Sequence, residues 1–147
     1  TDHAVTKVQV AHAAARVPAR CVVAGADAAE SASRVAQAMS RSGSCVLTFE
    51  LPSGISAAQA AAMIRERLAN LLPRITPPST LLVTGGETLL GVCRALGATH
   101  LEVDGELGPG VPHSRLCAGL WSGVDVVSKS GAFGPPHWLD DFLATAR

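Results

Sequence analysis

Over the first hundred residues, short apolar segments alternate with segments whose apolar residues recur at the spacing of an α-helix. This alternation limits the possible folds. The strand-like segments are residues 20–24 (RCVVA), 44–49 (SCVLTF), 80–84 (TLLVT) and 99–103 (THLEV). Strands separated by helices usually run parallel, and a parallel sheet needs helices on both of its faces. We therefore predict an α/β domain with three layers, in which helices flank a mostly parallel sheet.

Capping residues mark where the predicted helices begin and end. Asp27 can cap a helix with Glu30 in the reciprocal position, and Ser56 with Gln59 forms the same kind of pair. Two glycines are placed to end helices, Gly43 and Gly97. These signals predict helices over residues 27–43, 56–72 and 88–96.

A helix is also predicted at the start of the chain, over residues 5–15. Its spacing puts four side chains on one face, which we expect to turn towards the core: Val5, Val8, His12 and Ala15.

The pattern changes after residue 105. Strands are predicted at residues 116–121 and 125–128, and their short connections favour antiparallel edges, which makes the sheet mixed. Pro135 and Pro136 suit the start of a last helix, which Trp138 and Phe142 help to pack down. The 147 residues have the size of one domain, so we expect a single domain over residues 1–147.

The composition excludes several classes of protein. Twelve Lys and Arg balance twelve Asp and Glu without a basic stripe, and aromatic residues are only 3% of the chain, so no nucleic-acid partner is expected. No apolar run is long enough to cross a bilayer, and no signal peptide is visible. We expect a soluble, cytoplasmic protein with no membrane partner.

The cysteines and histidines lack the spacing of metal sites. No C-x-x-C pair occurs among the four cysteines, which are interpreted as buried thiols rather than zinc ligands or disulfides.

The first turn that is a candidate binding site follows the strand at residues 80–84. Gly85 and Gly86 allow close approach of the backbone, and the first amides of the next helix can bind an anion. The hydroxyls of Thr84 and Thr88 can add hydrogen bonds to phosphate oxygens. Glu87 either holds Mg²⁺ beside the phosphates or simply favours the N-terminus of the helix.

A second glycine-rich turn follows the strand at residues 125–128. Here Lys129 can neutralise phosphate charge, and Ser130 with the amides around Gly131 can donate hydrogen bonds. The turn is not a Walker A motif, because Lys129 precedes the glycines. The alternative is a solvated lysine before a tight turn.

A third segment, residues 105–112 (GELGPGVP), is rich in glycine and proline. It is interpreted either as a stiff wall beside a ligand or as a simple chain reversal between strands.

These three segments, in this order, resemble the C-terminal nucleotide-binding domain of the four-carbon acid sugar kinases. The family patterns are T-G-G-[DE]-T with a following A-L-G, then G-E-x-x-P-G-V-P, then K-S-G-x-F-G. They match residues 84–88, 95–97, 105–112 and 129–134, and residues 5–9 match a V-T-x-x-Q helix start. The likeness covers nearly the whole chain.

The resemblance implies that the domain binds ATP and Mg²⁺, and that a separate N-terminal domain binds the acid sugar. Within the parent chain, the γ-phosphate of ATP would pass to a hydroxyl of a four-carbon sugar acid, while the isolated domain is expected to be inactive. No position matches a family motif for the acid sugar, and the catalytic residues are not identified. The implied nucleotide-binding residues are Thr84, Gly85, Gly86, Glu87, Thr88, Gly105, Glu106, Gly110, Lys129, Ser130, Gly131 and Gly134, with Glu87 also a possible Mg²⁺ ligand.

Two departures from the family qualify this expectation. The family has a G-S-x-S turn before its first helix, whereas this chain starts at Thr1 without a methionine, which suggests a piece of a longer polypeptide. Glu87 also stands where many members have Asp.

Other functions remain open from the sequence alone. They are a non-catalytic nucleotide- or anion-binding module, a small NAD-binding domain and a purely structural domain. The NAD-binding alternative is the weakest, since no G-x-G-x-x-G follows the first strand.

Overall fold

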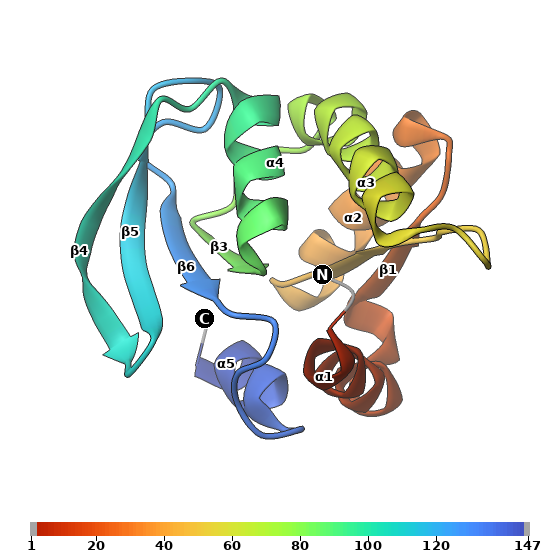
Figure 1. The fold of residues 1–147 in the computed structure, drawn as a ribbon, viewed down its shortest axis with the longest axis horizontal. Coiled ribbons are helices and arrows are strands. Elements are labelled where there is room, and N and C mark those ends of the chain that lie inside the picture. Colours follow the sequence, from red (N-terminus) through yellow and green to blue (C-terminus); the bar gives the residue numbers. More distant parts are fainter. Residues whose placement is uncertain (1–2, 146–147) are drawn as a thin grey trace.

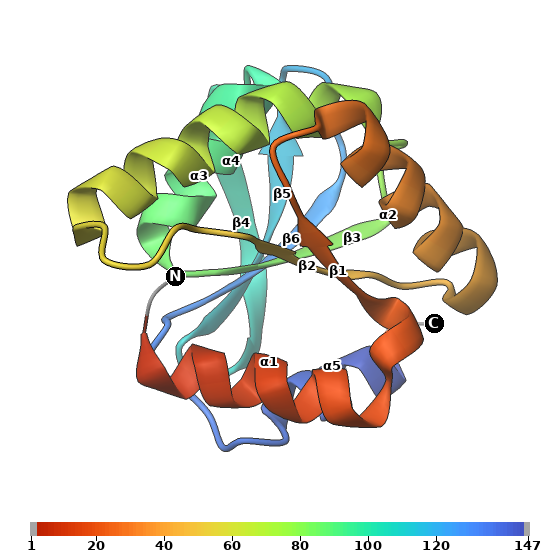
Figure 2. The same cartoon turned by 90° about the vertical axis from the view of Figure 1, so that its right-hand side faces the viewer.

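The computed structural model describes residues 3–145 and has three layers. The strands lie in the middle, with α2 (Ala28–Ser42), α3 (Ala57–Leu71) and α4 (Gly86–Leu96) on one side (Figure 2). On the other side, α1 (Ala4–Arg16) and α5 (Trp138–Thr145) lie side by side. Short 3-10 helices, η1 (Pro18–Arg20) and η2 (Leu72–Arg74), follow α1 and α3. The predicted three-layer α/β fold is confirmed.

The strands of the described chain form two sheets (Figure 1). In the smaller sheet, β1 (Cys21–Ala24) is parallel to β2 (Val46–Phe49). The larger sheet has the order β3-β6-β5-β4, with bounds β3 (Thr80–Thr84), β6 (Asp125–Lys129), β5 (Val111–Cys117) and β4 (His100–Gly108). The β3–β6 pair is parallel, whereas β5 is antiparallel to both of its neighbours. The sheet is therefore mixed, as predicted.

The later strands differ from the prediction in position and direction. The strand predicted at residues 116–121 begins earlier, as β5, and residues 118–123 form turns instead. Leu116 and Trp121 are both buried, so the apolar pattern marked core positions correctly but not a continuous strand. The strand predicted at residues 125–128 is confirmed as β6. It is central and parallel to β3, however, rather than an antiparallel edge.

Residues 105–112 are not a stiff loop. β4 continues to Gly108 and stays paired with β5 across two register shifts, so the segment is the far half of a β-hairpin. The chain reverses at Pro109 and Gly110, and Gly110 has the left-handed φ of 75° that such a reversal favours. Of the two interpretations of this segment, the chain reversal is the one that the structure supports.

The predicted helix ends are mostly confirmed. Asp27 caps α2 by accepting from the amides of Ala29 and Glu30, and Ser56 with Gln59 forms a complete capping box on α3. Two glycines with φ of 69° follow α2 and α4, Gly43 and Gly97. α4 starts two residues earlier than predicted, at Gly86.

The main core lies between the larger sheet and the pair α3 and α4. Its centre is made of Leu68, Leu96, Leu116 and Val126, each at most 3% exposed. A smaller cluster under α2 contains Val22, Val35 and Ala38, and Ile75 packs against both clusters. The carboxyl ends of β3 and β6 are thereby fixed at one edge of a packed sheet.

The predicted buried face of α1 is wrong. Its buried residues are Gln9 and Ala13, whereas Val8 is 51% exposed. The reason is that α1 packs against α5 and the turn before it, and these present backbone carbonyls rather than an apolar surface.

Candidate functional site

The two glycine-rich turns lie side by side at one edge of the larger sheet. Thr84, the last residue of β3, pairs in register with Lys129, the last residue of β6. The amide of Gly85 then donates to the carbonyl of Lys129 over 2.8 Å. The structure therefore brings together two segments that are more than forty residues apart in the sequence.

The first turn leads directly into the N-terminus of α4. Gly85 is the N-cap and has a φ of 93°, a conformation that side chains with a Cβ rarely adopt. Gly85 has no side chain with which to cap the helix. A Cβ added to Gly86 would meet no atom within 4 Å, so protein packing does not require glycine there. Open space beside an uncapped helix N-terminus suits the approach of an anion.

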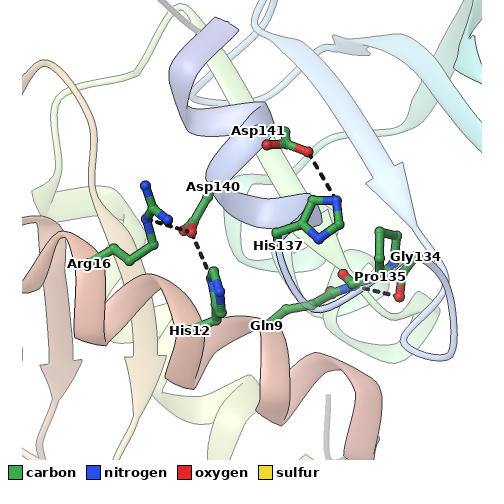
Figure 3. Close-up of polar contacts among 8 residues, drawn as sticks. All are labelled: Gln9, His12, Arg16, Gly134, Pro135, His137, Asp140 and Asp141. Carbon is green, nitrogen blue, oxygen red and sulfur yellow. Dashed lines mark hydrogen bonds and ion pairs between the residues drawn. The ribbon is translucent and has the colours of Figure 1, made fainter.

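The carbonyls of the second turn, residues 130–135, are held by buried donors. Gln9 is 2% exposed, and its Nε2 donates to the carbonyls of Phe133, Gly134 and Pro135 at 3.0, 3.1 and 2.9 Å. Figure 3 shows this side chain reaching from α1 to the turn. Thr6 Oγ1 donates to the carbonyl of Gly131 over 2.9 Å. The turn is thus attached to α1 by hydrogen bonds that its own backbone carbonyls accept from Thr6 and Gln9.

Lys129 belongs to the same network. The residue is 4% exposed, and its Nζ donates to the carbonyls of Ser130 at 3.0 Å and Phe133 at 2.8 Å. The ammonium also lies 5.4 Å from the centre of the Trp138 ring. Burial lowers the pKa of Lys129 below its usual value. The side chain is therefore not solvated, because its donors face its own turn, and the expected contact of Lys129 with phosphate stays a prediction.

The hairpin tip reaches the second turn. A Cβ on Gly110 would lie 3.9 Å from Cε2 of Phe133, a side chain that is 41% exposed. All three sequence segments singled out by their glycines therefore meet at this edge. Gly105 and Glu106, however, lie on β4 with exposed side-chain positions.

Glu87, in the first turn of α4, lies close to α3. Its carboxylate is 79% exposed, and Oε2 lies 4.0 Å from an Arg65 nitrogen. Within residues 3–145, no group of three or more His, Cys, Asp or Glu side chains is arranged to hold a metal ion. Glu87 therefore offers one carboxylate, which suits a Mg²⁺ ion that is bound mainly by phosphates.

The helix pair that borders the turn is joined by ion pairs (Figure 3). Asp140 on α5 accepts from His12 Nδ1 at 2.7 Å and lies 3.4 Å from Arg16 Nε, both on α1. α1 therefore holds both the turn and the helix that follows it.

Sequence reasoning missed Thr6 and Gln9 as site residues, although a signal was present. The V-T-x-x-Q pattern places them three residues apart, on one face of a helix. A buried glutamine needs hydrogen-bond partners, and here these are the carbonyls of the turn.

A crevice of about 680 Å³ lies away from the glycine-rich segments. It is lined at the ends of α1, α2 and α5, by Arg16, Arg20, Gly43, Asp140 and Leu143 among others. None of the three glycine-rich segments lines it.

The described helices include none that is long and apolar enough to cross a membrane. All four cysteines are free thiols, as interpreted from the sequence, although they are partly rather than fully buried.

Comparison with solved structures supports the fold. A Bordetella bronchiseptica protein with the DUF1537 domain, of unknown function, is 24% identical with a TM-score of 0.69. The alignment covers 99% of this chain and 37% of that one. A Haemophilus influenzae DUF1537 protein is 18% identical, with a TM-score of 0.60, and the alignment covers 99% and 38% of the two chains. The chain thus spans less than two fifths of these proteins.

No curated protein matched the sequence. The family model described as "Nucleotide-binding C-terminal domain" matches residues 3–139, a span that includes all three glycine-rich segments and the buried Gln9. The resemblance inferred from the sequence motifs is therefore confirmed, and the chain belongs to the family of nucleotide-binding C-terminal domains.

Proposed function

We propose that this domain binds ATP, with the phosphates lying across the sheet edge between the N-terminus of α4 and the turn at residues 130–134. The observation that carries the proposal is the hydrogen bond from Gly85 to Lys129, which joins the two turns. Helix amides and turn amides at one edge give several donors to one polyphosphate, without a Walker A lysine.

Open space at Gly86 supports this location. Glycine is a weaker helix former than alanine, and packing of the described residues gives no reason for glycine at this position. A ligand that comes close to the backbone supplies a reason for it. The hydroxyls of Thr84 and Thr88 lie at the ends of the same turn, and Mg²⁺ would arrive with the nucleotide and use Glu87, directly or through water.

The whole protein, in this proposal, is a kinase for a four-carbon sugar acid. Phosphoryl transfer depends on positioning and charge neutralisation more than on covalent chemistry, and this domain supplies both for ATP. A separate N-terminal domain holds the acid sugar, so that a hydroxyl attacks the γ-phosphate in line. The Bordetella relative was solved with bound citrate, a hydroxylated carboxylic acid, which makes acids of this kind the first substrates to test.

Calorimetric titration of the chain with MgADP tests the nucleotide site. We expect wild type to bind, and Gly86→Val to bind at least about tenfold more weakly, since the added side chain fills the space next to the helix amides. Ala29→Val is the matched control, because Ala29 is exposed in the first turn of α2, far from both glycine turns in sequence. Equal binding by wild type and Gly86→Val, or no binding by wild type, would contradict the proposed site.

A further inference from the structure

The second turn has an unusual distribution of hydrogen bonds, because its carbonyls are used while two of its amides are not. Five carbonyls accept from protein donors, those of Ser130, Gly131, Phe133, Gly134 and Pro135. Among residues 3–145, the amides of Gly131 and Gly134 donate to no protein acceptor.

The geometry of the peptide bond relates these two facts. In a trans peptide the N–H of one residue points opposite to the C=O of the residue before it, and the described chain has no cis peptide. A carbonyl of Ser130 that faces Lys129 therefore turns the amide of Gly131 away from Lys129. In the same way, a carbonyl of Phe133 that faces Gln9 and Lys129 turns the amide of Gly134 outwards.

Two further amides of the turn are used within the protein. The amide of Ala132 donates to Ser130 Oγ at 3.3 Å, and that of Phe133 donates to the carbonyl of Ser130 at 3.2 Å. The carbonyls of Gly134 and Pro135, which Gln9 also holds, precede prolines that have no N–H. The network thus holds five carbonyls of residues 130–135 within the protein and turns the amides of Gly131 and Gly134 outwards.

From this geometry we infer that Gln9 and Lys129 are positioning residues for the nucleotide. They aim the amides of Gly131 and Gly134 at the phosphates and do not touch the ligand themselves. Lys129 orients both amides, because it binds the carbonyls of Ser130 and Phe133, whereas Gln9 orients only that of Gly134. This inference rests on the proposed nucleotide site and adds how its second turn is preorganised.

A direct role for either side chain is disfavoured by burial. Gln9 is 2% exposed and Lys129 is 4% exposed, so little of either side chain is open to a ligand. Gln9 Nε2 donates to three backbone carbonyls and Lys129 Nζ to two. The space around Gly134 is equally full, since an added Cβ would lie 3.0 Å from Trp138 Cγ and 3.1 Å from Gln9 Nε2.

The test is an amide NMR titration of the chain with sodium pyrophosphate and with MgADP. In wild type, we expect the amide signals of both Gly131 and Gly134 to shift with ligand. In Gln9→Met, the Gly134 response should shrink while that of Gly131 persists, because Lys129 still binds the Phe133 carbonyl. In Lys129→Met, both responses should shrink, because neither the Ser130 nor the Phe133 carbonyl is then held by the lysine. Affinity should fall about tenfold in Gln9→Met and further in Lys129→Met, because an oriented bond to a charged phosphate is worth about that factor or more.

Controls separate positioning from general damage. Gln37→Met makes the same change at an exposed position of α2 and should leave both glycine responses intact. Gln9→Asn replaces Gln9→Met if that variant does not fold. It retains the amide group but has a shorter side chain, so the Gly134 response should also shrink. General damage would alter both glycine signals together in Gln9→Met.

The outcomes distinguish this inference from the proposed function. If wild type binds neither pyrophosphate nor MgADP, the nucleotide site itself is wrong. If wild type binds, and Gln9→Met or Gln9→Asn binds equally well with an unchanged Gly134 response, the positioning role is overturned.

Discussion

Gly134 and Gly86 are required for opposite reasons, although both belong to the candidate site. Gly134 has a φ of 89°, and its missing Cβ leaves room for Trp138 and Gln9. Gly86 is helical and faces open space. Packing within the protein therefore requires the first glycine. It gives no reason for the second, where we propose that the nucleotide approaches the backbone.

Gly134→Ala should destabilise the fold by about 2–3 kcal/mol. The left-handed backbone accounts for about 1–2 kcal/mol of this, and crowding against Trp138 and Gln9 for the rest. Urea unfolding measures the loss. Gly54→Ala is the matched control, because Gly54 has a φ of 78° but no neighbour within 4 Å, so it should show the backbone cost alone. Equal losses in the two variants would refute the crowding argument.

Cys45 should react as a protected thiol. Burial raises its pKa to about 11 from an ordinary 9.0, and the neighbouring Cys21 contributes in the same direction. Because the native thiol keeps its proton over this range while the unfolded one releases it, stability should fall as pH rises from about 9 to 11. The alkylation rate of Cys45 in native protein, followed by peptide mass spectrometry, should keep rising to about pH 11. Levelling near pH 9, as expected for the denatured chain, would contradict this.

At the scale of elements, α1 shows what a sequence pattern can hide. Apolar spacing predicted a helix at nearly the right bounds, but assigned its buried face to Val8 and its neighbours rather than to Gln9 and Ala13. Hydrophobic periodicity finds faces that pack on apolar surfaces. Here the partner is a turn of carbonyls, so the packed face is polar and small. Only the V-T-x-x-Q pattern pointed to it.

α5 depends on Asp140 for its attachment. Among its residues 138–145 none is fully buried, so packing alone holds this helix weakly. Asp140→Asn removes the charge that pairs with His12 and Arg16, and should make the amides of α5 exchange hydrogen about tenfold faster, while β6 amides are unchanged. Asp141→Asn is the matched control, because that carboxylate is 71% exposed and its ion-pair partner among residues 3–145 is His137, at 3.6 Å. Similar effects of both substitutions would argue against a special role for Asp140.

At the scale of the molecule, the sequence predicted the layers of the fold better than it predicted which strands are adjacent in the sheet. Helix N-caps, glycines at helix ends and apolar runs are signals carried by neighbouring residues. They were enough to predict the α/β class and most bounds of the helices and strands. The insertion of β6 between β3 and β5 is not local, since it joins residues more than forty positions apart. That insertion is what places Gly85 against Lys129, so the sequence identified the segments of the site but not their contact.

Ligand binding should therefore stabilise the molecule beyond the site. The turns lie on β3 and β6, whose side chains form the main core, and Ile75 joins that core to the smaller cluster around Val22. If the clusters unfold as one unit, MgADP at 100 times its dissociation constant should raise the free energy of unfolding by about 2.7 kcal/mol in both.

Hydrogen exchange resolves the two clusters. Exchange of the Val126 amide in β6 and of the Val22 amide in β1 should slow by about 100-fold with MgADP at that concentration. In Gly86→Val, which binds at least about tenfold more weakly, both should slow by about tenfold or less. Slowing at Val126 alone would show that the small cluster opens independently, and that the nucleotide stabilises only the part of the molecule that carries the two turns.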